Sequence, residues 1–121
     1  MNIKGVAGVI HAAGLIRDGA VDEMAWEDFE AVGAPKMAGA WHLHTLTAAL
    51  PLDFFVLFSS LASVTGNVGQ SNYAAANTYL DALARCHRVS GTLASSLQIP
   101  AVGGAGMAAL AVRAAKAHAA L

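Results

Sequence analysis

Residues 52–83, LDFFVLFSSLASVTGNVGQSNYAAANTYLDAL, decide the fold of this chain. The segment begins with a compact apolar run that ends in Ser59 and Ser60, crosses a glycine-containing loop and enters an alanine-rich stretch that carries Tyr73. This order predicts a buried strand, a loop and a helix. Because ligands in an open α/β sheet bind beyond the carboxyl ends of the strands, we expect Ser60 and Tyr73 to face one crevice.

The elements on either side of this segment alternate between strand and helix. Such alternation is typical of a parallel sheet with right-handed crossover helices. The sequence therefore predicts an α/β, Rossmann-like fold that is incomplete, with about three strands and without the N-terminal cofactor-binding half. The predicted strands cover residues 5–10, 53–59 and 93–99, and the predicted helices begin near Ala25, at Pro35, near Gln70 and near Gly106.

The composition favours a folded domain over a disordered segment. The chain has 121 residues, of which 56% are hydrophobic and 12% are charged. This balance predicts a buried core. We interpret Trp26, Phe29, Trp41 and the methionines as core residues, and His11 as a packing residue at the end of the first strand.

Charge and cysteine content exclude several classes of partner and site. The formal net charge of −1 gives no electrostatic reason to expect a nucleic acid or an anionic membrane as partner. A single cysteine excludes an internal disulfide, and the five histidines do not cluster, so no metal site is expected. Without a recognisable signal segment or an apolar span of about 20 residues, the sequence predicts a cytoplasmic location.

Four polar side chains suggest proton-transfer chemistry. Tyr73 and Asn77 are four residues apart and share a helix face. A tyrosine has a pKa of about 10, and a neighbouring ammonium such as that of Lys36 would bring it closer to neutral pH. A hydroxyl such as that of Ser60 could donate to a carbonyl oxygen that gains negative charge.

These residues, with their surrounding motifs, resemble the ketoreductase domains of modular polyketide synthases and related fatty acid synthases, which are members of the short-chain dehydrogenase/reductase superfamily. The lysine that most superfamily members carry four residues after the tyrosine is replaced here by Asn77, and a lysine stands upstream at Lys36. This exchange is typical of synthase ketoreductases. The resemblance implies that residues 1–121 are a partial ketoreductase domain. It is carried by HAAG (11–14), APKMAGAWHLH (34–44), DFFVLFSSLAS (53–63), GQSNYAAANTYLDALA (69–84) and SLQIPAVGGAGM (96–107).

The resemblance also implies an activity, in which NADPH reduces a β-ketoacyl thioester held on the phosphopantetheine of an acyl carrier protein. Tyr73 would protonate the keto oxygen, Ser60 would hold that oxygen, and Asn77 would support a proton-relay water. Lys36 would lower the pKa of Tyr73 and contact the nicotinamide ribose. Other synthase domains, or the missing N-terminal half, would be partners. The implied cofactor-binding residues are Ala13, Gly14, Lys36, Tyr73 and Pro100.

Two further residues, Asp18 and Gln70, are implied in substrate binding and stereocontrol. Asp18 aligns with the last aspartate of the LDD motif of B-type ketoreductases. The tryptophan typical of the A type would fall at Thr65, and the proline frequent in B-type loops would fall at Val68. The sequence therefore predicts a B-type course, which gives the D-configured hydroxy product.

Three alternatives remain open from the sequence. The chain could be a non-catalytic, structural half-domain that packs against another reductase or synthase domain. The segment 104–109 matches the pattern G-x-G-x-x-A of a dinucleotide-binding loop. Ser71 lies in a partial match to the nucleophile elbow of serine hydrolases, although the final glycine is replaced by Tyr73.

Overall fold

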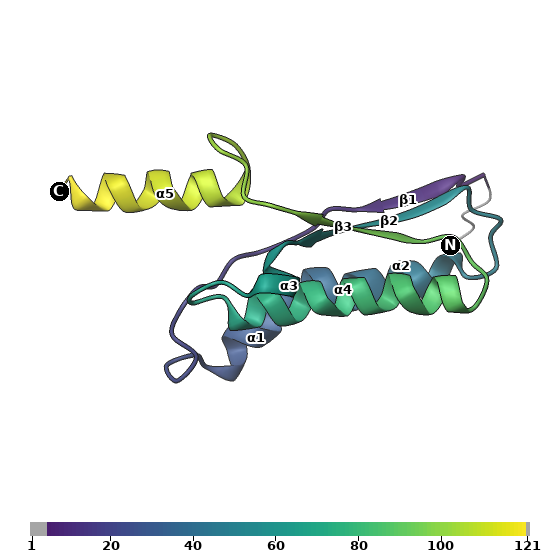
Figure 1. Cartoon of the computed structure of the whole chain (residues 1–121), viewed down its shortest axis with the longest axis horizontal. Helices are drawn as coiled ribbons and strands as arrows, with labels where there is room; N and C mark the ends of the chain where they lie inside the picture. The colour runs from purple at the N-terminus through teal and green to yellow at the C-terminus, as the bar shows by residue number, and fades with distance from the viewer. Residues whose placement is uncertain (1–4, 121) are drawn as a thin grey trace.

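A parallel sheet of three strands forms the centre of the molecule. The computed structural model describes residues 5–120, with β1 at Gly8–His11, β2 at Phe54–Ser60 and β3 at Ser95–Ile99. β2 lies in the middle and pairs in parallel with both neighbours (Figure 1). This arrangement confirms the predicted Rossmann-like parallel sheet and brings the carboxyl ends of all three strands to the same edge.

Helices α1 to α4 cover one face of the sheet, and α5 projects beyond it (Figure 1). None of the helices in the described part of the chain is both long and apolar enough to cross a membrane. The helices are α1 (Trp26–Gly33), η1 (Ala34–Ala38), α2 (Gly39–Thr47), α3 (Ala62–Thr65), α4 (Ser71–Val89) and α5 (Gly106–Ala119).

The prediction that a helix begins at Pro35 is wrong, because the chain is already helical at Trp26 and stays helical to Thr47. The segment around Pro35, η1, is a π-helical turn between α1 and α2. Proline has no N–H to donate to a preceding turn, and a wider turn accommodates its ring. The proline thus changes the helical pitch here instead of starting a new helix.

The core lies between the sheet and helix α4. Strand alternation directs Phe55 and Leu57 of β2 toward the helices, where they are fully buried with Leu80 of α4. The opposite face of the sheet carries large apolar side chains that are exposed in the described chain, among them Ile10, which is 62% exposed, and Phe54, which is 43% exposed. The helices of this chain therefore cover only one of the two faces.

The prediction that both tryptophans are core residues is wrong. Trp26 is 69% exposed and Trp41 is 48% exposed. Trp26 stacks on Phe29 of the same helix with 6.3 Å between ring centroids, and Trp41 borders a second cavity together with Tyr79 and His87 of α4. The apolar periodicity correctly predicted a helix, but periodicity alone does not show whether another element covers the apolar side of that helix.

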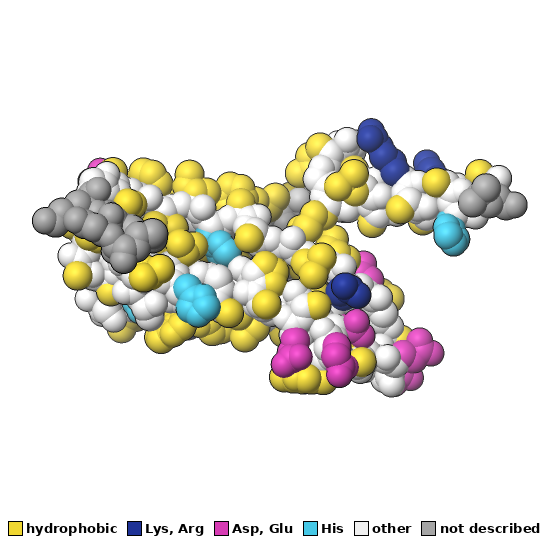
Figure 2. Space-filling view, turned by 180° about the vertical axis from the view of Figure 1, so that it is seen from behind, with side chains coloured by type: hydrophobic (Ala, Val, Ile, Leu, Met, Phe, Trp, Pro, Cys, Tyr) yellow, Lys and Arg dark blue, Asp and Glu magenta, His cyan; other side chains and the backbone are white. Residues whose placement is uncertain are grey.

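Acidic side chains gather at the end of the body that carries α1, as Figure 2 shows. The Lys and Arg side chains of α5 lie on the same side of the molecule in this view, above the acidic ones. The acidic side chains and the basic side chains of α5 therefore both lie toward the end of the molecule at which the strands have their carboxyl ends. The acidic side chains of the segment before and within α1 are Asp18, Asp22, Glu23, Glu27, Asp28 and Glu30.

Candidate active site

A cavity of about 500 Å³ opens at the carboxyl ends of β2 and β3. Ser60 lines it from the end of β2, Tyr73 from the first turn of α4, and Lys36 from the π-helical turn η1. The structure therefore brings three of the predicted site residues into one space, although they come from three separate elements. Gln70 and Pro100, also predicted, line the same cavity.

Lys36 is buried and fixed at this cavity. Its side chain is only 3% exposed, and its Nζ donates a hydrogen bond of 2.9 Å to the carbonyl oxygen of Phe58. The same nitrogen lies 5.6 Å from the centroid of the Tyr73 ring. Burial lowers the pKa of Lys36 from its usual value of 10.5.

The absence of a side chain at Gly14 leaves room for the end of the Lys36 side chain. A Cβ at Gly14 would lie 3.3 Å from Cε of Lys36 and 3.2 Å from Cε of Met107. Alanine at this position would push against both side chains. Gly14 is therefore in contact with the site through Lys36, although it does not itself line the cavity.

The two serines at the end of β2 have different roles because successive strand residues point to opposite faces. Ser59 is buried and donates a 3.1 Å hydrogen bond to the carbonyl oxygen of Asn77 on α4. Both serines are lining residues of the cavity, and the Oγ of Ser60 accepts a 3.1 Å hydrogen bond from the N–H of Ala62. Since that bond uses a lone pair of the oxygen, the hydroxyl proton of Ser60 can be donated to a ligand.

Tyr73 is positioned by its neighbour Asn72, which the sequence analysis missed. Asn72 is 2% exposed, and its Nδ2 donates to the carbonyl oxygens of Arg17 at 2.8 Å and Asp28 at 3.2 Å. Its Oδ1 accepts the N–H of Tyr73 at 2.7 Å. A buried amide with all these bonds fixes the start of α4 against the loop after β1. The only sequence signal for this positioning role of Asn72 is that it directly precedes Tyr73.

Asn77 does not line the cavity. It is fully buried, and its Nδ2 donates a 2.8 Å hydrogen bond to the carbonyl oxygen of Tyr73. Its Oδ1 is buried and has no hydrogen-bond partner among the described residues. Asn77 is therefore the one of the four proposed catalytic residues that does not line the cavity, and it is connected to the site through the backbone of Tyr73.

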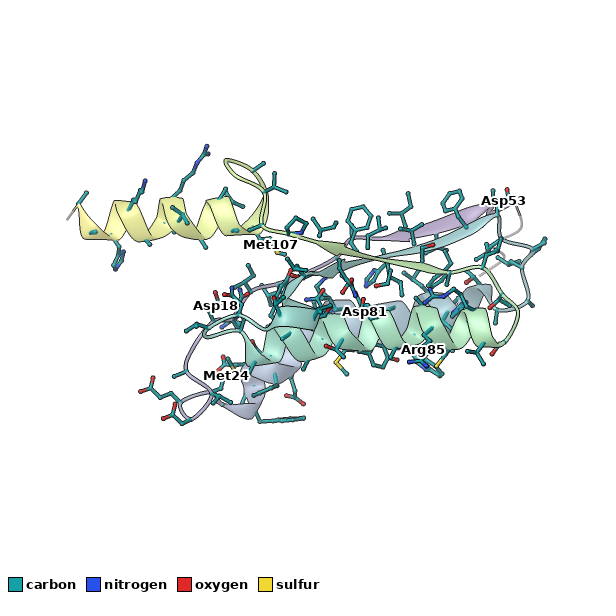
Figure 3. All side chains as sticks on the ribbon, viewed as in Figure 1. Asp18, Met24, Asp53, Asp81, Arg85 and Met107 are labelled. Carbon is teal, nitrogen blue, oxygen red and sulfur yellow. The ribbon has the colours of Figure 1, made fainter. Side chains whose placement is uncertain are left out.

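The loop after β1 is tied to the loop before α4. Gln70 Nε2 donates to the two carboxylate oxygens of Asp18 at 3.1 and 3.3 Å, and the N–H of Gly19 donates to the carbonyl of Gly69 at 2.9 Å. Figure 3 shows Asp18 beside the start of α4. Asp18 and Ala13 do not line the cavity, and the loop contributes Ala12 and Ile16 instead. Asp18 thus reaches the site through Gln70.

The cavity suits a nicotinamide cofactor in its chemistry. Lys36 is the only side chain with a formal charge at neutral pH among the lining residues that the structure describes. Apolar side chains from β2, β3 and α5, such as Phe58, Ile99 and Met107, form much of the remaining wall. A cation, apolar walls and several hydroxyl-bearing residues together suit a ligand that combines a ribose, a planar ring and a ketone.

The two other sequence motifs behave differently. Ser71 is the first residue of α4, is exposed and is not among the lining residues of the cavity, so its geometry does not favour the hydrolase alternative. Gly104 and Gly106 both adopt positive φ angles, of 76° and 77°. The segment 105–108 lines the same cavity as Ser60 and Tyr73. This glycine-rich segment therefore belongs to the site described above.

Comparison with known proteins shows the family of this chain. The family model for the KR (ketoreductase) domain matches residues 1–104. The chain belongs to the ketoreductase domain family. The match and the parallel sheet place it among the ketoreductases of polyketide synthases, in the short-chain dehydrogenase/reductase superfamily.

Individual relatives are similar over most of this chain. Polyketide synthase GfsA from Streptomyces halstedii is 58% identical over 92 residues, which cover 76% of this chain. A 6-methylsalicylic acid synthase from Penicillium terrestre is 48% identical over 111 residues, which cover 90% of it. A solved A-type ketoreductase from a modular polyketide synthase superposes with a TM-score of 0.81 and 48% identity over 84% of this chain.

The matching segment is a small part of each relative. It spans 1% of the GfsA sequence, 6% of the 6-methylsalicylic acid synthase and 22% of the solved ketoreductase chain. The family thus implies ketoacyl reduction, and the relatives in which the segment occurs are large synthases.

Proposed function

We propose that this chain is the catalytic part of an NADPH-dependent reductase, which converts a β-ketoacyl thioester on an acyl carrier protein to the β-hydroxyacyl thioester. Residues 1–121 would be a partial ketoreductase domain within a synthase. The observation that carries the proposal is the shared cavity of Ser60, Tyr73 and Lys36, three residues from separate elements.

In this mechanism Ser60 donates its hydroxyl proton in a hydrogen bond to the keto oxygen and stabilises the charge that develops there. NADPH, when bound, supplies the hydride that attacks the carbonyl carbon. As the electron pair of the C=O bond moves to oxygen, Tyr73 transfers its phenolic proton to that oxygen. The tyrosine is then a phenolate and regains a proton from solvent.

Lys36 supports the phenolate in this proposal. Its Nζ lies 5.6 Å from the centroid of the Tyr73 ring, and an ammonium at that range favours the charged form of the phenol. Its second proposed role is a contact with the nicotinamide ribose. Asn77 is proposed to hold a relay water, which the unpartnered, buried Oδ1 supports.

The remaining cofactor contacts are assigned to the loops at the carboxyl edge. Pro100 lines the cavity directly after β3. Ala13 and Gly14 lie in the loop after β1, where Gly14 is in contact with Lys36. These three residues are proposed to lie along the nicotinamide ribose and ring.

For stereochemistry we propose the B-type course, in which Asp18 and Gln70 direct the substrate. Their hydrogen bond of 3.1 Å, at the wall that holds Tyr73, supports a joint role. Two of the similar solved structures are an A-type and an A1-type ketoreductase, so the opposite course is the competing assignment. Chiral analysis of the hydroxy product decides between them, and an L product refutes the B-type proposal.

A non-catalytic half-domain is the second candidate. It is favoured by the apolar sheet face on which Ile10 and Phe54 are exposed, since such a face is suited to packing against another domain. The two candidates are separated by titrating NADPH into the full chain and following the cofactor fluorescence. Saturable binding supports the reductase. No binding at millimolar NADPH means that the isolated chain lacks the proposed activity.

A further inference from the structure

We propose that His11 is a positioning residue of this site, which holds the π-helical turn η1 so that Lys36 points toward Tyr73. This inference rests on the proposed function for its catalytic consequence, but its structural part stands independently. His11 is the last residue of β1 and is 6% exposed, and it does not line the cavity. Its effect is therefore exerted through the backbone of Lys36.

The contact between the two residues is direct. His11 Nε2 lies 3.3 Å from the carbonyl oxygen of Lys36. Since a carbonyl only accepts hydrogen bonds, Nε2 carries the proton and donates. Burial and, secondarily, the charge of Lys36 lower the pKa of His11 from 6.5, so the ring is neutral at neutral pH. The neutral ring of His11 can thus donate from Nε2 at neutral pH.

The turn that His11 holds has an unusual hydrogen-bond pattern. The N–H of Gly39 is shared between the carbonyl of Ala34, five residues earlier, and that of Lys36. Single π-helical turns of this kind are uncommon and occur frequently at functional sites. Each residue of a helix rotates by about 100°, so closing the turn to a regular α-helix would rotate Lys36 relative to α2. The orientation of the lysine therefore depends on the wider turn.

Gly39 makes the approach of the histidine possible. A Cβ at this position would lie 3.2 Å from Cε1 of His11, closer than most real contacts of a Cβ. The ring consequently lies against the glycine while its Nε2 reaches the carbonyl of Lys36. At the other end of the lysine, Gly14 lies against Cε. The end of β1 and its loop thus contact Lys36 at both its backbone and its side chain.

The test compares two substitutions of similar size. His11→Gln keeps a donor near the position of Nε2, whereas His11→Leu fills the space without one. Reductive methylation of the full chain, followed by peptide mapping, reports whether Lys36 is buried, and the exposed Lys116 serves as internal reference. We expect protection of Lys36 in the parent and in His11→Gln, and at least about tenfold faster modification in His11→Leu.

Protection of Lys36 in His11→Leu equal to that of the parent would overturn the proposal, as would rapid modification of Lys36 in the parent. If His11→Leu fails to unfold cooperatively, His11→Asn replaces it, because its amide is shorter and does not reach the carbonyl. Equal protection in the Asn and Gln variants would then overturn the proposal. His42→Ala, at an exposed histidine of α2, is the matched control and is expected to leave Lys36 protected.

The catalytic consequence is measured on residues 1–104 grafted into the matching segment of the similar solved ketoreductase. In His11→Leu we expect kcat to fall about tenfold and its pH profile to differ from that of the parent, because Lys36 no longer lies beside Tyr73. His11→Gln should restore both. An inactive parent graft contradicts the proposed function alone. An active graft whose pH profile is unchanged in His11→Leu contradicts the positioning role.

Discussion

The Nζ of Lys36 donates a 2.9 Å hydrogen bond to the carbonyl oxygen of Phe58, the strand residue two positions before Ser60. This bond joins the π-helical turn to the end of β2. It also compensates part of the cost of burying an amine that is 3% exposed. We therefore expect that the buried lysine positions an amine beside Tyr73 and does not stabilise the fold.

Replacement of this lysine is expected to separate stability from activity. Because burial disfavours the ammonium, Lys36→Met should leave the free energy of unfolding unchanged or raise it, while reductase activity falls by about 100-fold or more. Urea unfolding and NADPH oxidation measure the two effects. The control is Lys116→Met on the exposed helix α5, which should change neither. A large loss of stability in Lys36→Met would contradict this account of the lysine.

Removal of the phenolic hydroxyl tests the proposed proton donor. Tyr73→Phe should lower kcat by about 10²–10⁴-fold with little change in the unfolding transition, because the ring still packs. Tyr79→Phe, on the same helix but outside the cavity, is the matched control. Steady-state kinetics of both variants against the parent make the comparison. Equal kcat values for the two variants would exclude Tyr73 as the acid.

The two adjacent serines should respond in opposite ways. Ser59→Ala removes the buried hydrogen bond to Asn77 and should cost about 1 kcal/mol of unfolding free energy, with a small effect on kcat. Ser60→Ala removes the hydroxyl that lines the cavity and should lower kcat by about 10²-fold with a smaller effect on stability. Unfolding curves and kinetics on both variants measure this. The reverse pattern would mean that the strand register at the site is wrong.

Asp81 is expected to make the fold sensitive to acid. It lies between α4 and the sheet (Figure 3) and accepts hydrogen bonds from Ser63 at 2.6 Å, from Gln98 at 3.1 Å and from Ser96. Burial opposes its charge, but these donors together hold the pKa of Asp81 below its usual value of 3.8. The carboxylate therefore contributes stability above that pH, and the contribution is lost as pH falls through the lower, folded-state value.

The corresponding measurement is urea unfolding at about pH 7 and about pH 3, for the parent and for Asp81→Asn. The parent should lose more unfolding free energy between the two conditions than the variant, because the amide does not titrate. An equal loss in both proteins would show that Asp81 does not contribute to acid sensitivity.

Much of the fold follows from local sequence patterns. The apolar run of β2 and the alanine-rich segment of α4 were predicted to within a residue or so, because a buried parallel strand and a capped helix each leave a strong local signal. The meeting of Ser60 and Tyr73 was also predictable, since it depends only on a strand end and on the helix that follows it. These features need no knowledge of distant packing.

Other features depend on contacts that no local pattern contains. The burial of Lys36 requires a carbonyl from β2 and a π-helical turn, and neither can be predicted from the residues around the lysine. Trp26 and Trp41 were assigned to the core because the periodicity of their helix does not show how far other elements cover its apolar side. Asn77 shares a helix side with Tyr73, as predicted, yet its amide turns back to the tyrosine carbonyl.

The most direct measurement is transfer of deuterium from NADPH that carries deuterium at both C4 positions to a β-ketoacyl thioester, with the chain grafted into the similar solved ketoreductase. The account predicts one deuterium at the β carbon of the hydroxy product, and a rate that falls by about 10²–10⁴-fold in Tyr73→Phe. Product that carries no deuterium, or a rate that is the same in Tyr73→Phe, would contradict the claim that these residues catalyse ketone reduction.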